Sequence, residues 1–125
     1  MAKVLMSGRF DFPHAGHIRT IQLLASDYDS VVVAILDYPE QKWPLCYRRR
    51  IFEEIFWDYK NVKVLSNKTH FGEMTLAEWK TYKCDYYAAG NFEVLNHMES
   101  IGVPCIYVDR PYQISARYYD KPKET

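Results

Sequence analysis

The chain has 125 residues, of which 48% are hydrophobic and 26% are charged, a balance typical of one globular domain with a substantial core. Sixteen Lys and Arg residues offset sixteen Asp and Glu residues, so the net charge is zero. A neutral chain excludes a general attraction to nucleic acid or to an acidic membrane surface. We therefore expect a single domain over residues 1–125 whose anion binding depends on local groups.

Cysteine content and hydropathy indicate where the protein works. Cys46, Cys84 and Cys105 are odd in number and lack the spacing of a metal site, which is typical of reduced thiols in a cytosol. The N-terminus has no hydrophobic signal region, and the longest aliphatic run, 31–36, is far too short to span a bilayer. The sequence thus predicts a cytoplasmic protein that is not held in a membrane.

Apolar runs alternate with helical patterns along the chain. The apolar runs predict strands at 4–7, 31–36, 62–65, 85–89 and 105–108. Apolar residues spaced by three or four positions predict helices at 14–25, 47–59, 75–82 and 92–101. Strands that alternate with helices pair in parallel through right-handed crossovers. We therefore predict an α/β fold, a single Rossmann-like doubly wound parallel sheet of about five strands with helices on both faces.

The stretch 7–17 links the first predicted strand to the first predicted helix. Loop amides and the unpaired N–H groups of a helix N-terminus favour an anion there, and Gly16 leaves the backbone open to it. His14 and His17 are three residues apart, so both imidazoles lie on one face of the first turn. Taken alone, such a pair also fits a surface position or half a metal site, but no further Cys or His has zinc spacing. In this context the pattern favours a triphosphate.

Several other segments are expected to meet this stretch. The carboxyl ends of parallel strands share one edge of a sheet, and ligands of such folds bind there. The segments that follow predicted strands are 8–17, 37–42, Gly90 and 110–115. Three consecutive arginines also open the second predicted helix, where cations oppose the helix dipole, so at least one is expected to meet an anion. Among them we choose Arg49.

These residues resemble the nucleotidyltransferase superfamily marked by a His-x-Gly-His motif. Within it the chain is most similar, in length and spacing, to small cytidylyltransferases that act on glycerol 3-phosphate. Residues 14–17 give the full motif, and residues 8–11 are similar to the Gly-Thr-Phe-Asp of the family. Residues 110–117 are similar to its closing Arg-Thr-x-Gly-Ile-Ser-Thr-Thr motif, of which they keep the Arg, Ile and Ser. The resemblance covers nearly the whole chain.

The resemblance implies an enzyme that transfers a cytidylyl group from CTP to an alcohol phosphate, such as glycerol 3-phosphate, and releases pyrophosphate. It also implies Mg²⁺ as cofactor and a homodimer. Together with the residue patterns, it predicts as catalytic residues His14, His17, Lys42, Arg110 and Ser115. The predicted nucleotide-binding residues are Gly8, Arg9, Phe10, Gly16, Arg49, Gly90, Asn91 and Ile114. The acceptor is assigned to Asp37 and Lys42, and the metal to Asp11.

Some residues depart from the family pattern. Arg9 stands where the family has threonine, Asn91 where it has an acid, and Ala116 and Arg117 where it has hydroxyl residues. Two alternatives stay open, and these departures support the second of them. One is an ATP-dependent adenylyltransferase of the same fold, and the other is a nucleotide-binding module that has lost catalysis. The short chain and its Arg-x-x-x-Ile-Ser ending favour the cytidylyl branch.

Overall fold

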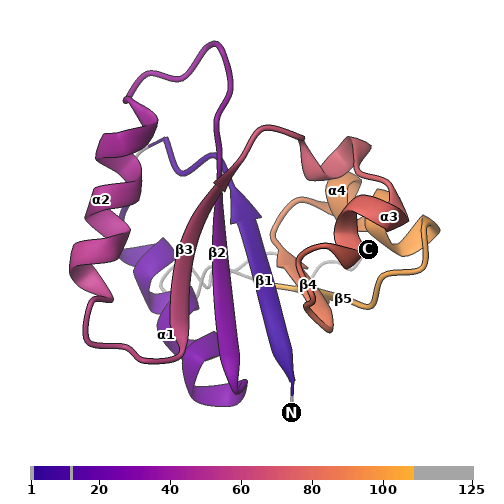
Figure 1. The fold of residues 1–125 in the computed structure, drawn as a ribbon, viewed down its shortest axis with the longest axis horizontal. Helices are drawn as coiled ribbons and strands as arrows, with labels where there is room; N and C mark the ends of the chain where they lie inside the picture. The colour runs from indigo at the N-terminus through magenta and orange to yellow at the C-terminus, as the bar shows by residue number, and fades with distance from the viewer. Residues whose placement is uncertain (1, 12, 109–125) are drawn as a thin grey trace.

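A computed structural model describes residues 2–11 and 13–108 of the chain (Figure 1). Its strands are β1 (Lys3–Gly8), β2 (Ser30–Leu36), β3 (Val62–Asn67), β4 (Tyr86–Ala89) and β5 (Cys105–Tyr107). Its helices are α1 (Ala15–Asp27), α2 (Leu45–Ile55), the 3₁₀ helix η1 (Phe71–Glu73), α3 (Leu76–Lys80) and α4 (Phe92–Ser100). All strand pairs are parallel, in the order β3-β2-β1-β4-β5, so the predicted α/β fold is confirmed.

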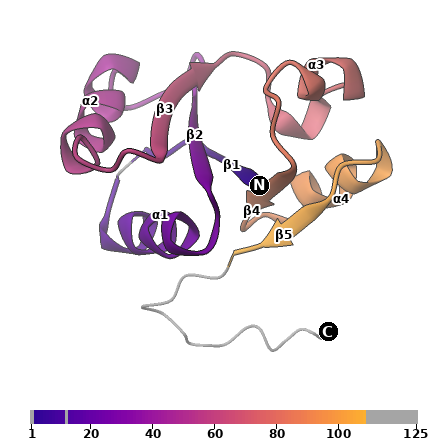
Figure 2. The ribbon, with the colours of Figure 1, turned by 60° about the horizontal axis from the view of Figure 1, so that its bottom comes forward.

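The sheet separates two buried clusters because successive side chains of a strand point to opposite faces. Val4 and Met6 of β1 belong to one cluster, together with Ile21 of α1 and Phe52 of α2. Leu5, between them, belongs to the second cluster, which η1, α3 and α4 complete. Figures 1 and 2 show α1 and α2 grouped at one side of the molecule, and α3 and α4 at the other. The fold is therefore wound in both directions from β1.

The change of direction falls between β1 and β4. From β1 the chain passes through α1 to β2 and through α2 to β3, all on one side. It then crosses through η1 and α3 to β4, which pairs with β1 on its other edge. The segments after β1 and β4 consequently diverge, and such a point in an open parallel sheet leaves a crevice at the carboxyl ends of the strands.

Two elements differ from their predicted bounds for identifiable reasons. The second helix was predicted to end at residue 59 but ends at Ile55. The apolar spacing continues past Ile55 because a turn follows the helix, in which the Tyr59 N–H donates to the Phe56 carbonyl (2.9 Å). β3 was predicted to end at residue 65 but continues to Asn67, because Asn67 pairs with Leu36 at the end of β2. The 3₁₀ helix η1 lies in a stretch that we predicted as loop.

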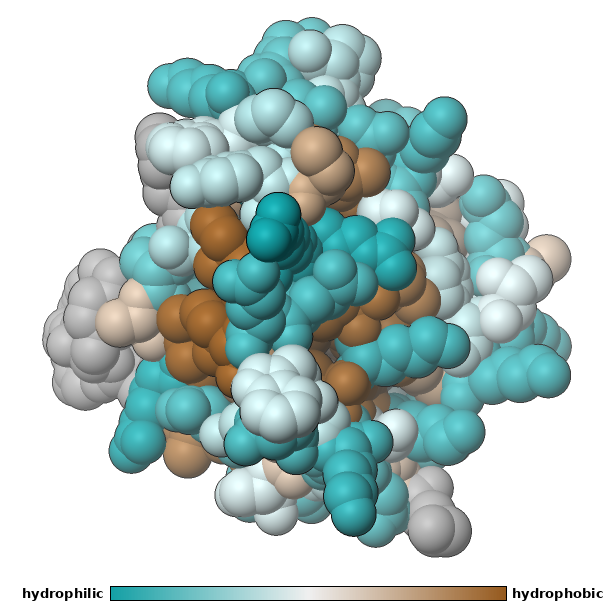
Figure 3. Space-filling view, turned by 60° about the vertical axis from the view of Figure 1, so that its left-hand side comes forward, coloured by the Kyte–Doolittle hydropathy of each residue, from teal (hydrophilic) through white to brown (hydrophobic). Residues whose placement is uncertain are grey.

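The outer surface of α2 is charged. Arg49 pairs with Glu53 (3.1 Å), and Arg50 pairs with Glu54 (2.9 Å), each one helical turn apart. Figure 3, seen from the side of α1 and α2, shows hydrophilic side chains over most of this face, around smaller apolar areas.

Across the described ranges, no helix combines the length and the hydropathy needed to cross a membrane. All three cysteines are free thiols, of which Cys46 is exposed and Cys84 and Cys105 are partly buried.

Candidate functional site

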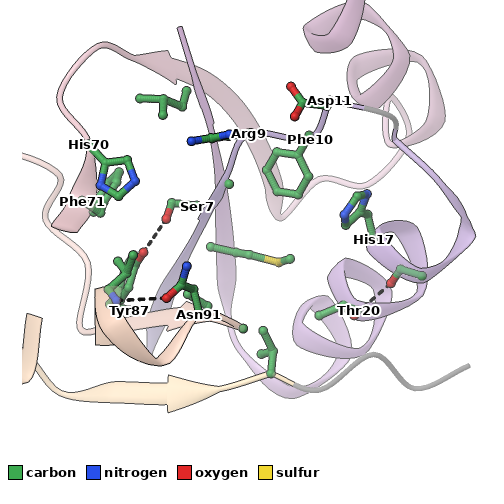
Figure 4. A pocket seen from close by; sticks show the side chains of 18 of the residues that line it. Ser7, Arg9, Phe10, Asp11, His17, Thr20, His70, Phe71, Tyr87 and Asn91 are labelled. Atoms are coloured by element: carbon green, nitrogen blue, oxygen red, sulfur yellow. Dashed lines mark hydrogen bonds between the residues drawn. The ribbon is translucent and has the colours of Figure 1, made fainter. Parts of the chain in front are cut away.

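A cavity of about 940 Å³ opens at the carboxyl ends of β1 and β4, where the winding reverses (Figure 4). Its walls come from the loop after β1, the first turns of α1, the segment from β3 to η1, and the residues after β4 and β5. These segments are far apart in the sequence. The segments after β1 and β4 meet here, as predicted from parallel strand order, whereas residues 37–42 do not line the cavity and the segment from β3 to η1 was not predicted to.

His14 and His17 form one unit at the start of α1. The His14 ring caps the helix by accepting the Gly16 N–H at Nδ1 (3.0 Å), and His17 Nδ1 accepts the His14 N–H (3.3 Å). The two rings stack with centroids 3.8 Å apart and planes 24° apart. This reciprocal arrangement fixes both imidazoles at the helix N-terminus, whose partial positive charge no acidic residue of the first turn offsets.

The hydrogen bonds also assign the tautomer of each ring. Because Nδ1 of His14 and of His17 accepts a backbone N–H, the neutral ring carries its proton on Nε2. Each ring is therefore a donor through Nε2–H, and both line the cavity. Paired donors at a helix N-terminus suit a phosphate group.

Phe10 gives the loop after β1 its shape. Its φ angle is 51°, in the left-handed region that bulky residues rarely occupy. The ring is buried and packs edge-on against Phe52 (5.0 Å between centroids) and His17 (4.9 Å). A Cβ atom at Gly8 would come within 3.1 Å of the same ring, so a larger residue there would displace the ring by a few tenths of an ångström. Phe10 thus joins the loop to the core and to His17.

Arg9 and Asp11 lie on either side of Phe10 and meet Tyr38, which follows β2. The Arg9 guanidinium lies over the Tyr38 ring, 4.9 Å from its centroid, and the Tyr38 hydroxyl donates to the Asp11 carboxylate. Desolvation and this hydrogen bond raise the pKa of Tyr38. Both Arg9 and Asp11 line the cavity, where Figure 4 shows them on the loop above Ser7.

The β4 side supplies polar groups of a different kind. Asn91 caps α4 by accepting the Glu93 N–H at Oδ1 (2.8 Å). Tyr87 and Ser7 share a hydrogen bond of 2.5 Å between their hydroxyls, across the β1–β4 pair. Burial raises the pKa of Tyr87 far above its ordinary value, so the phenol stays protonated in the folded protein. A Cβ atom at Gly90 would lie 3.1 Å from the Val108 carbonyl, so the backbone after β4 passes close to the end of β5.

Most of the predicted site residues within the described ranges are brought together. The ones that line the cavity are Gly8, Arg9, Phe10, Asp11, His14, Gly16, His17, Gly90 and Asn91. Asp37, Lys42 and Arg49 do not line it. Arg49 pairs with Glu53 and donates to the Val64 carbonyl (3.4 Å). Arg110, Ile114 and Ser115 lie outside the described residues.

Metal binding was predicted at Asp11. Within residues 2–11 and 13–108, no three His, Cys, Asp or Glu side chains gather closely enough to hold a metal ion. Asp11 itself accepts a hydrogen bond from Tyr38. A metal site built by this part of the chain alone is therefore not observed.

Sequence reasoning missed three residues at or behind the cavity. His70 and Asn67 line it from the end of β3, and Asn67 has a buried side-chain oxygen with no hydrogen-bond partner. Arg48, and not its neighbour Arg49, is the fully buried arginine of α2. Its place four residues before the buried Phe52 was the available signal, because positions four apart share a helix face.

Comparisons with known proteins agree with this geometry. Residues 5–120 match the family described as Cytidylyltransferase-like. A phosphopantetheine adenylyltransferase of Natranaerobius thermophilus is 38% identical over 66 residues, which are 51% of this chain and 41% of that protein. The chain thus spans less than half the length of this curated relative. That relative is an adenylyltransferase, whereas we predicted the greatest similarity to glycerol-3-phosphate cytidylyltransferases.

Solved structures give the same fold. The NadR protein in complex with NAD and AMP-PNP matches with a TM-score of 0.67 at 21% identity, over 91% of this chain and 39% of that one. The lipopolysaccharide core biosynthesis protein from Thermoplasma volcanium GSS1 matches with a TM-score of 0.62 at 19% identity, over 88% and 98% of the two chains. With a family match that spans residues 5–120, the chain belongs to the cytidylyltransferase-like family.

Proposed function

We propose that this protein transfers a nucleotidyl group from a nucleoside triphosphate to a phosphate monoester and releases pyrophosphate. One observation carries the proposal: the stacked His14–His17 pair, Arg9 and the 90–91 turn face a single cavity at the point where the sheet changes direction. The donors lie there beside the Arg9 cation, and the first turn of α1 has no acidic residue. Family membership supports the same class of reaction.

The chemistry needs alignment more than it needs a base. A phosphate monoester has a second pKa near ~6, so it is already a dianion and a nucleophile at neutral pH. It attacks the α-phosphorus in line with the departing pyrophosphate oxygen, and one P–O bond forms as the other breaks. The protein must hold two anions that repel each other and stabilise the charge that builds at the phosphorus.

The described side chains suit these tasks. We assign His17 Nε2–H to the α-phosphate and His14 Nε2–H to the bridging or β-phosphate oxygens. Arg9 neutralises the β- and γ-phosphates, and Gly8 and Gly16 let the backbone approach them. Phe10 holds the loop, and the turn at Gly90 and Asn91 borders the nucleoside. These groups are donors, cations or packing residues, which favours direct transfer without a covalent enzyme intermediate.

Other assignments stay predictions. Asp37 and Lys42 follow β2 and are proposed to meet the acceptor. Arg49 is proposed for the nucleotide only because of the family resemblance, since it pairs with Glu53 and does not line the cavity. Arg110, Ile114 and Ser115 complete the proposed site from outside the described residues. We also propose a homodimer, which sedimentation of the full chain tests.

ATP is the nucleotide that we favour. The relative at 38% identity is an adenylyltransferase, and the NadR structure that matches this fold was solved with AMP-PNP. CTP remains the second candidate, because the family is described as cytidylyltransferase-like and the closing motif is similar to that of small cytidylyltransferases. The acceptor is proposed to be the phosphate ester of an alcohol or of pantetheine.

Mg²⁺ fits as an ion carried by the nucleotide. It prefers oxygen ligands and commonly takes most of them from phosphates and water, so a single carboxylate from the protein suffices. Asp11 provides that carboxylate at the cavity, fixed by the Tyr38 hydroxyl. When bound, the ion would neutralise phosphate charge and keep the triphosphate in one conformation.

Pyrophosphate release tests the proposal. The full chain is incubated with Mg²⁺, each of the four nucleoside triphosphates, and phosphopantetheine or glycerol 3-phosphate as acceptor. We expect release that depends on the acceptor and is fastest with ATP. If release were fastest with CTP, the protein would instead be a cytidylyltransferase. Nucleotide binding without release for any pair would favour a module that has lost catalysis.

A further inference from the structure

We infer that Arg48 is a positioning residue: its buried guanidinium holds the backbone of the loop at residues 8–11 and, through Phe10, sets the place of the His17 ring. The inference rests on the proposed function, because the loop matters only if it binds the phosphates. Arg48 itself does not line the cavity.

Arg48 is fully buried and is held by four hydrogen bonds. Nη1 donates to the carbonyls of Arg9 (2.5 Å) and Leu36 (3.1 Å), and Nε donates to the Trp43 carbonyl (3.0 Å). Nη2 donates to the side-chain oxygen of Gln41. One side chain therefore joins the loop after β1, the end of β2, and the loop that leads into α2.

All of these partners are neutral oxygens. Among residues 2–11 and 13–108, no carboxylate forms an ion pair with Arg48. Burying a guanidinium without a counter-charge is costly, and hydrogen bonds recover only part of that cost. The remaining positive charge lies directly behind the Arg9 carbonyl, and an anion in the cavity would offset it.

The bond to Arg9 fixes the peptide that precedes Phe10. In a trans peptide the carbonyl and the following N–H point in opposite directions, so the Phe10 N–H is turned away from Arg48. Phe10 then adopts a φ angle of 51°, which persists only where its surroundings hold it. Its ring reaches His17 edge-on at 4.9 Å. Arg48, Arg9, Phe10 and His17 thus form a continuous chain of contacts.

Lysine cannot replace this arrangement. A guanidinium has donors in a rigid planar fork, whereas an ammonium is a single flexible point charge. Arg48→Lys therefore keeps the buried charge and loses the simultaneous hold on Arg9, Leu36 and Trp43. Arg48→Met removes the charge as well, and the two substitutions separate geometry from charge.

Two control variants come from the same helix. Arg50→Met removes an arginine whose side chain is 76% exposed and paired with Glu54. Phe56→Leu weakens the core one turn after Phe52 and has no hydrogen bond to the loop. The first controls for lost surface charge, and the second controls for lost stability.

Binding of inorganic pyrophosphate is measured by calorimetry, and the His17 ring resonances are recorded by NMR without ligand. We expect Arg48→Lys to bind pyrophosphate about tenfold more weakly, the equivalent of about 1.4 kcal/mol, and to shift the His17 ring resonances. Arg48→Met should weaken binding further. Arg50→Met and Phe56→Leu should match the wild type in both measurements, although Phe56→Leu melts earlier.

The outcomes separate this inference from the proposed function. If the wild type does not bind pyrophosphate, the proposed function fails, and the ligand-free His17 resonances still decide whether Arg48 positions the ring. Wild-type affinity in Arg48→Lys, or unchanged His17 resonances, would overturn the inference. If Arg48→Met does not fold, Arg48→Lys alone gives the decision.

Discussion

His14 and His17 hold each other in place at the N-terminus of α1. Each ring accepts a backbone N–H through Nδ1, and the rings stack at 3.8 Å. The hydrogen bonds that stabilise the helix start therefore also orient the two Nε2–H groups. Donors fixed before the substrate arrives lose little freedom when the charge develops, which is the main advantage of a preorganised site.

The cap and the donors can be separated by substitution. Asparagine is a good N-cap residue, and glutamine at the third helical position completes a capping box. We expect His14→Asn and His17→Gln to unfold near the wild-type temperature. Each should lower kcat by about 10²- to 10³-fold, the usual effect of removing one transition-state donor. Thermal unfolding and steady-state kinetics measure the two effects.

Thr75→Ala is the matched control for this pair. Thr75 caps α3 by accepting the Glu78 N–H (3.2 Å), and it does not line the cavity. Its loss should cost about 1 kcal/mol of stability and leave kcat unchanged. Near wild-type turnover in His17→Gln would remove His17 from the mechanism.

Arg9 is expected to bind phosphate through its charge. Its exposed side chain lines the cavity beside Tyr38, so Arg9→Met should raise the Kd for pyrophosphate and weaken the dependence of that Kd on salt. Arg19→Met removes an exposed arginine from the outer part of α1 and serves as the control. Equal Kd values for the two variants at low and high salt would contradict the role given to Arg9.

Gly8 is expected to be needed for the position of the Phe10 ring. In Gly8→Ala the new Cβ would lie 3.1 Å from the ring, which must move by a few tenths of an ångström and take its edge contact with His17 along. We expect kcat to fall by about tenfold, or about 1.4 kcal/mol in the barrier, with a small change in melting temperature. Unchanged kcat would show that the ring position does not matter for turnover.

Tyr87 should make the protein sensitive to alkali. Burial raises the pKa of its hydroxyl, whose ordinary value is 10.0, so above about pH 10 the unfolded chain loses this proton while the folded chain keeps it. Below pH 10, the contribution of Tyr87 to the free energy of unfolding is present in full. It falls as pH rises above 10, by at most about 1.4 kcal/mol per pH unit.

Urea unfolding between pH 8 and pH 11.5 measures this effect. Tyr87→Phe removes the titrating group together with its hydrogen bond to Ser7, so it should be less stable than the wild type at pH 8. Above pH 10 its stability should fall less steeply. Parallel curves for the two proteins over the whole range would contradict the assignment.

The fold and one half of the site follow from local patterns. Alternating strand and helix patterns predict a doubly wound sheet, and sheet order brings Gly8, His17 and Gly90 together without any knowledge of side-chain contacts. The histidine pair was recognisable because its spacing matches one turn of a helix. These features depend on residues close together in the sequence or on the general geometry of parallel sheets.

The rest depends on contacts that no local pattern encodes. Three consecutive arginines look alike in the sequence, yet Arg48 is buried while Arg49 and Arg50 pair with glutamates one turn away. The helix dipole opposes all three cations, so it could not indicate which of them is buried. Likewise, His70 caps η1 and lines the cavity, in a stretch that we predicted as a loop.

The fate of the α-phosphorus shows whether the protein is a nucleotidyltransferase. The full chain is incubated with ATP or CTP labelled at the α-phosphate, Mg²⁺, and a panel of phosphate monoesters that includes phosphopantetheine and glycerol 3-phosphate. We expect the label to join an acceptor as one pyrophosphate is released per transfer, and the His14→Asn, His17→Gln double variant to lose this transfer. The proposed function would be contradicted if the label stayed on the intact nucleoside triphosphate with every acceptor, or if it appeared in a nucleoside diphosphate together with free phosphate.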